Sequence, residues 1–177
     1  MKANILIKIV VLSMLIPMGL QAQLGGLLKK PTAAGLLGDV TSGMDFFNVA
    51  AKHYSDALLP KEEAAKLKAE VDALQGKSDS KALSEISGKL QKAADEKLKA
   101  GKTLDAEAKK HVQDGQAAFT KGLAKWAGLA AALALAAKDG GADAAMAAAI
   151  PVVQQAVKDL PAIKKMGDAV AAVNKIK

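Results

Sequence analysis

The sequence predicts an all-α protein, an antiparallel bundle of five to six helices, and three observations lead to that prediction. Alanine, the strongest helix former, accounts for 38 of the 177 residues. Only five residues are Phe, Tyr or Trp, so aromatic side chains, which favour strands, are scarce. Apolar residues recur at steps of three and four between short turn signals, which is helical periodicity. Short loops favour antiparallel neighbours.

Residues 1–22 have the parts of a secretory signal peptide. Lys2 and Lys8 supply early positive charge, residues 9–20 are almost wholly apolar, and Ala22 provides a small residue at the exit. We expect cleavage there and export to the periplasm, with a retained N-terminal anchor as the alternative. The chain has no cysteine, so we expect neither a lipoprotein nor a disulfide.

Residues 23–40 follow as an expected flexible lead-in, because four glycines and a proline lie among its leucines. Residues 41–177 are expected to form a single helical-bundle domain, since a chain of this length is enough for one sizeable core.

The first helix of that domain is predicted to begin after an N-cap at Thr41 or Ser42 and to run to about Leu59. The second is predicted from Pro60, which suits a first helical turn, to a stop at Gly76. Their predicted inner faces carry Phe46, Phe47, Ala50, Tyr54 and Leu58 in the first helix and Ala64, Leu67, Val71 and Leu74 in the second.

The third helix is predicted between residues 78–80 and Gly101, with an apolar stripe at the usual spacing. Thr103 is then predicted to cap one long helix that continues to residues 138–141. Glycines inside it are expected bend points. We expect a fifth helix from about Asp143 that kinks or breaks at Pro151, and a last helix that starts at residues 159–161. The residues concerned are Leu83, Ile86, Leu90, Ala94 and Leu98 in the third-helix stripe, and Gly115, Gly122 and Gly128 at the bend points.

Two stretches lose amphipathic character, residues 126–137 (WAGLAAALALAA) and 144–153 (AAMAAAIPVV). A helix that is apolar all round must be buried or face lipid. We therefore expect a central, alanine-rich apolar hairpin, either as plain core or as the wall of a ligand cavity. The candidate cavity lining is Phe119, Trp126, Leu129, Leu133, Leu135, Met146, Ile150, Val153, Val157 and Met166.

The charge pattern argues against nucleic-acid binding. All 25 basic residues are lysine, and arginine, the usual residue for bidentate phosphate and base contacts, is absent. Acid-first pairs four residues apart, such as Glu62 with Lys66 and Asp95 with Lys99, indicate solvated helix faces.

No motif predicts an enzyme. The triplets at residues 76–78 and 101–103 resemble the end of a phosphate-binding loop but lack its first glycine, so they are predicted to be helix caps. His53 and His111 belong to no recognised metal-binding pattern, although His111 lies four residues after Glu107, and both are predicted to be ordinary, partly exposed helix residues. We expect no catalytic residue, no metal and no cofactor.

The hairpin segment WAGLAAALALAAKDGGADAAMAAAIPVV and the all-helical outline resemble small all-helical periplasmic components of bacterial lipid-trafficking systems, including those that move sterols. The resemblance implies a non-enzymatic carrier of a hydrophobic ligand between the inner and outer membranes. Two alternatives stay open: a structural or protein–protein interaction bundle of the cell envelope, for example a homo-oligomer, and a membrane-surface-active protein. The first expected partner is a lipid or hydrophobic small molecule, and the alternatives are envelope transport proteins or a membrane surface.

Overall fold

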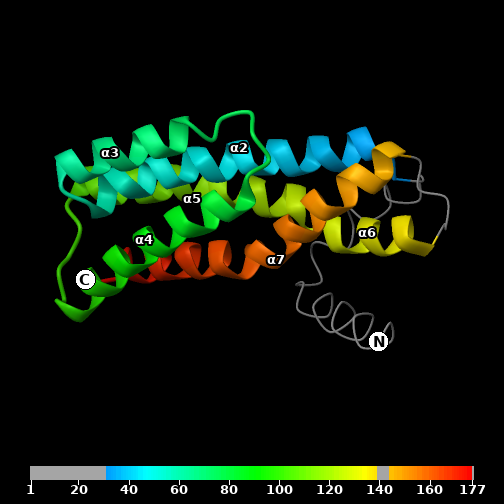
Figure 1. Cartoon of the computed structure of the whole chain (residues 1–177). Coiled ribbons are helices and arrows are strands. Elements are labelled where there is room, and N and C mark those ends of the chain that lie inside the picture. Colours follow the sequence, from blue (N-terminus) through cyan, green and yellow to red (C-terminus); the bar gives the residue numbers. More distant parts are fainter. Residues whose placement is uncertain (1–30, 139–143, 177) are drawn as a thin grey trace.

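The computed structural model describes residues 31–138 and 144–176, and helices account for most of them. The predicted signal peptide, the first part of the lead-in and the expected cap at Asp143 lie outside these residues. The helices are α2 (Ala33–Leu58), α3 (Lys61–Asp72), α4 (Ser80–Lys99), α5 (Ala106–Trp126), α6 (Leu129–Lys138) and α7 (Ala144–Val173). They pack side by side as an elongated bundle (Figure 1), which confirms the all-α prediction.

Helix α2 is the central element, because it contacts each of the other five described helices. It begins at Ala33, where the Thr32 side chain accepts a hydrogen bond from the Gly35 backbone N–H. The expected start at residues 41–42 is therefore wrong, and residues 33–40 of the expected flexible lead-in are helical. Leu36 and Val40 lie in the core, so tertiary packing supports these turns despite their glycines.

Helices α3 and α4 follow the predicted pattern closely. The α3 stripe, with Leu74 in the turn that follows, is buried, and so are the first four positions of the α4 stripe, whereas Leu98 is only partly buried. Asp79 caps α4 by accepting a hydrogen bond from the Ala82 N–H. In α2, Phe47, Ala50, Tyr54 and Leu58 are buried as expected, and Phe46 is the partly exposed exception.

The predicted long helix after Thr103 is two helices. Helix α5 begins at Ala106, because Asp105 rather than Thr103 caps it. It ends at Trp126, and a turn at residues 127–128 separates it from α6. Of the three glycines named as bend points, only Gly128 lies at a break, and Gly115 and Gly122 are buried inside α5.

Helix α7 is one helix where two were predicted. Pro151 and Pro161 both lie inside one continuous helix, where a break and a new start were predicted. Figure 1 shows α7 changing direction along its length. Proline is a common cause of such bends, because it removes a backbone hydrogen bond. Both proline rings face solvent. The C-terminal half is held by burial of Ile163, Met166 and Val170.

Glycines let α2 and α5 approach closely. A Cβ added to Gly122 would lie 2.7 Å from a Phe47 ring carbon, and one added to Gly115 would lie 2.5 Å from a Tyr54 ring carbon. Gly43 on α2 makes the reciprocal contact with the Trp126 indole. The aromatic rings therefore occupy the space where glycine has no side chain, and this sets the register of the two helices.

Candidate functional site

The expected apolar hairpin forms, because α6 packs against α7. It lies at one end of the bundle, beside the start of α2, rather than at its centre (Figure 1). The reason is that α2 fills the centre with larger side chains, among them Met44 and Phe47, which are fully buried. One side of α6 contributes to the core through Leu129, Ala132 and Leu133.

The other side of the hairpin is exposed, and its exposed residues within 129–136 and 144–151 are all alanine, leucine or proline. Leu135 is 43% exposed and is one of two large hydrophobic side chains at the described surface, the other being Val49 on α2. We call the exposed apolar side chains of the hairpin the apolar end. Its members are Ala131, Leu135, Ala144, Ala145, Ala147, Ala148 and Pro151.

The ten candidate cavity residues divide into three groups. Six are core residues: Phe119, Trp126, Leu129, Leu133, Val153 and Met166. Three are partly buried and pack against the core, Met146, Ile150 and Val157, and only Leu135 is exposed. The structure thus brings most of the set together as packed core.

Aromatic packing explains why the deeper candidates belong to the core. The Phe47 ring lies 5.5 Å from the Phe119 ring and 5.1 Å from the Trp126 ring, the latter in an edge-on arrangement. Tyr54 lies 6.4 Å from Phe119. These separations are typical of aromatic pairs in contact. The space between these helices is therefore filled by the chain's own aromatic rings.

The same core contains polar groups without partners. Asn48 is 4% exposed and both its side-chain polar atoms lack a hydrogen bond, as does the Tyr54 hydroxyl. Burial raises the pKa of the Tyr54 hydroxyl well above its ordinary value, because the phenolate would lose its hydration.

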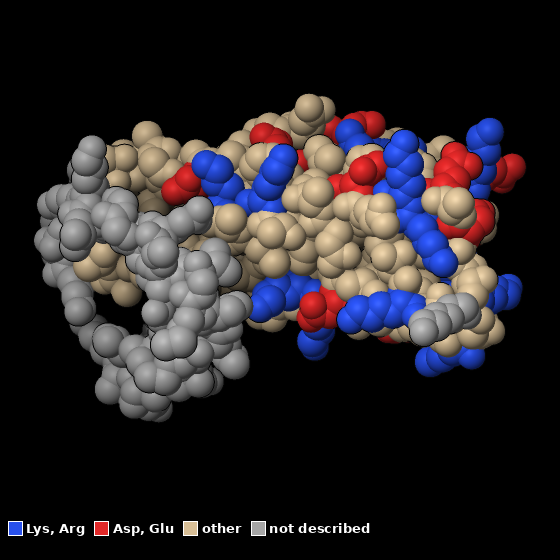
Figure 2. Space-filling view, turned by 180° about the vertical axis from the view of Figure 1, so that it is seen from behind, with Lys and Arg blue, Asp and Glu red and all other residues tan. Residues whose placement is uncertain are grey.

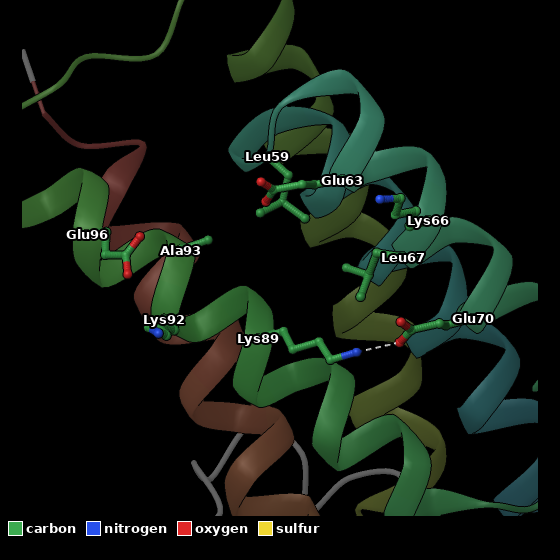
Figure 3. A pocket seen from close by; sticks show the side chains of 9 residues that line it. All are labelled: Leu59, Glu63, Lys66, Leu67, Glu70, Lys89, Lys92, Ala93 and Glu96. Carbon is green, nitrogen blue, oxygen red and sulfur yellow. Dashed lines mark hydrogen bonds and ion pairs between the residues drawn. The ribbon is translucent and has the colours of Figure 1, made fainter.

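A groove of about 350 Å³ lies elsewhere, between α3 and α4 (Figure 3). Its apolar lining is Leu59, Leu67 and Ala93, and its rim carries three lysines and three glutamates. The Lys89 ammonium pairs with the Glu70 carboxylate at 2.6 Å across one end. Because its charges balance, the groove does not concentrate one sign of charge for a small anion or cation. None of the ten predicted residues lines it.

The molecular surface is mixed in charge as well. Figure 2 shows lysine side chains and acidic side chains interleaved over the described part of the visible face. Ion pairs join neighbouring helices, Lys52 with Asp72 and Lys68 with Asp56, so several lysines are already partnered.

His53 and His111 are brought together, which the sequence did not predict. Their Nδ1 atoms lie 3.3 Å apart across the α2–α5 interface, and both side chains are half-buried. The residues are far apart in the chain, and the pairing depends on the register of two helices. The only feature of the sequence that bears on this pairing is that each histidine lies in a predicted helix with aromatic residues on its inner face.

Two further findings apply to residues 31–138 and 144–176. No group of three or more His, Cys, Asp or Glu side chains there is arranged to hold a metal ion. No helix in that part of the chain is long and apolar enough to cross a membrane.

Comparison with known proteins adds no relative. No protein family, curated protein or solved structure matches this chain.

Proposed function

We propose that this chain is an exported, non-enzymatic helical protein that binds a lipid- or sterol-like ligand in transit between the inner and outer membranes, and that the ligand docks on the apolar end. The observation that carries the proposal is the exposed hairpin surface, whose exposed residues within 129–136 and 144–151 are alanine, leucine and proline, on a bundle whose helices α2–α5 carry many charged side chains. Periplasmic location follows from the signal-like residues 1–22.

The physical basis is burial of apolar area. Removing 100 Å² of apolar surface from water contributes about 2.5 kcal/mol, so a hydrocarbon or ring system laid on the hairpin gains affinity without a deep cavity. Alanine side chains project little from the helices, so a flat ligand can approach the helix backbones closely. Leu135 is the largest exposed side chain of the apolar end and the expected centre of contact.

The filled core bears on the second candidate, an interaction bundle of the envelope. The buried candidate residues pack against aromatic rings and are not available to a ligand. What remains is the exposed apolar patch of the apolar end, and such a patch also suits a protein partner. A membrane surface is the third possible occupant. The three candidate functions predict different behaviour of the purified protein in solution.

The test begins with the exported chain purified from the periplasm, extracted with organic solvent and analysed by mass spectrometry for lipid. Titration with a fluorescent sterol and a fluorescent fatty acid then measures affinity. Leu135→Glu places a charge in the proposed contact and is expected to weaken binding at least about tenfold. Val49→Glu is the matched control, because Val49 is 45% exposed but lies on α2 outside the hairpin.

Absence of both co-purified lipid and probe binding would contradict the carrier proposal, as would equal effects of the two variants. Concentration-dependent oligomers without lipid would then favour the interaction bundle. Leakage from anionic vesicles, lost in Leu135→Glu, would favour the membrane-active alternative.

A further inference from the structure

The two histidines of the chain form a pair across the α2–α5 interface. His53 Nδ1 and His111 Nδ1 lie 3.3 Å apart, while the ring centroids are 5.6 Å apart. Because the centroids are so much farther apart than these nitrogens, the two Nδ1 atoms are turned toward each other. A hydrogen bond between them requires a proton on one Nδ1 and a free lone pair on the other.

The scaffold around the pair is fixed by packing. Next to His53, the buried Tyr54 ring lies against Gly115, four residues after His111. A Cβ on Gly115 would lie 3.2 Å from the His53 Cβ, so the missing side chain permits the close approach of the helices at this level. Val112, beside His111, is fully buried. Both histidines are therefore held by rigid helices, which reduces the entropy lost when they bind a ligand together.

The nitrogen separation matches the spacing of two ligands on one tetrahedral ion. A Zn–N bond of about 2.0–2.1 Å at the tetrahedral angle separates two coordinating nitrogens by about 3.3–3.4 Å. The rings must tilt so that both lone pairs converge on the ion, and the donor ring must move its proton from Nδ1 to Nε2. Half-burial leaves solvent access for both changes.

We propose that His53 and His111 form a two-histidine chelate for one borderline divalent transition ion of the Zn²⁺, Ni²⁺ or Cu²⁺ type. Imidazole nitrogens suit these ions, whereas Ca²⁺ and Mg²⁺ take oxygen ligands. Because no group of three or more ligand side chains is present in the described part of the chain, water fills the remaining positions. The site is thus open and exchangeable, and it is separate from the proposed lipid surface.

The test uses the exported chain without a histidine tag, because His53 and His111 are then the only imidazoles present. Calorimetric titration with Zn²⁺, Ni²⁺ and Cu²⁺ is expected to show one saturable site, with Cu²⁺ tightest and Mg²⁺ giving no heat. The paramagnetic resonance spectrum of the Cu²⁺ complex is expected to show coupling to two nitrogens. Metal is also expected to raise the melting temperature, because it binds the folded pairing of α2 with α5.

His53→Gln and His111→Gln test the two ligands separately. Each is expected to weaken binding at least about tenfold and to abolish the metal-dependent rise in melting temperature. Both residues are half-buried, and far-UV circular dichroism checks that each variant remains folded. Absence of saturable binding by the unaltered chain, or unchanged binding in either variant, would overturn the proposal. Coupling to a single nitrogen would do the same.

Discussion

Replacing Gly43 by alanine tests whether the approach of α2 to α5 depends on a missing side chain. An added Cβ at this position would overlap Cδ1 and Nε1 of the Trp126 indole. The indole has little room to move, because it is 2% exposed and packs edge-on against Phe47 at 5.1 Å. Its Nε1–H also donates a hydrogen bond to the Val40 carbonyl at 3.1 Å.

The expected magnitude is the balance of three effects. Overpacking of a filled core costs about 1–3 kcal/mol. Loss of the indole hydrogen bond with its N–H left buried costs about 1–3 kcal/mol. The better helix propensity of alanine stabilises α2 by about 1 kcal/mol. We therefore expect a net loss of about 1–5 kcal/mol in the free energy of unfolding, which lowers the melting temperature of a chain this size by about 2–20 °C.

Urea unfolding followed by far-UV circular dichroism and by fluorescence measures this change. Trp126 is the single tryptophan, so its emission reports directly on the altered contact. Gly88→Ala is the matched control, because Gly88 is an exposed helical glycine on α4 and an added Cβ there meets nothing within 4 Å. The control is expected to gain about 0.5–1 kcal/mol. A Gly43→Ala protein as stable as the unaltered chain would refute the reasoning, since both glycines would then be alike.

Three further predictions concern stability. Tyr54→Phe removes a buried hydroxyl without a partner and is expected to be neutral or to stabilise by about 1–2 kcal/mol in urea unfolding at neutral pH. The pKa of Tyr54 is higher in the folded chain than the value of about 10 in the unfolded chain, so above about pH 10 the hydroxyl loses its proton more readily in the unfolded chain. Deprotonation then favours unfolding, and the unaltered chain is expected to lose more stability above about pH 10 than Tyr54→Phe does. Equal alkaline slopes would contradict this assignment. Pro161→Ala restores a backbone donor in the interior of α7 at an exposed position and is expected to stabilise by about 1–2 kcal/mol in thermal melts; a loss would mean that the bend itself is required. Asp105→Ala removes the acceptor of the 2.8 Å hydrogen bond from the Ala108 N–H and is expected to cost about 1 kcal/mol, most of which Asp105→Asn recovers; equal losses in both would point to charge rather than capping.

Local patterns in the sequence were sufficient for the helices that are amphipathic and bounded by clear signals. Every predicted position of the α3 and α4 stripes except Leu98 is buried, because apolar residues at steps of three and four lie on one face of a helix and can turn to the core together. Turns after Leu58 and Asp72 were also indicated by Pro60 and Gly76. These features depend on interactions within a few residues of one another.

Helix ends and continuity were less predictable where tertiary packing outweighs local preference. Glycine-rich residues 33–40 are helical because Leu36 and Val40 reach the core. Pro161 is tolerated inside α7 because the residues that follow it are buried. Conversely, an uninterrupted apolar run concealed the turn at residues 127–128.

The candidate site divides in the same way. The sequence alone determined that two alanine-rich stretches without charge, residues 126–137 and 144–153, flank a short turn, because that property is carried by consecutive residues. Its place at the end of the bundle, the core role of Trp126 and Phe119, and the meeting of His53 with His111 were decided only by the tertiary structure. The physical reason is the register of α2 on α5. That register depends on glycines and aromatic rings that meet across the interface, and no local pattern in either helix specifies which residues those will be.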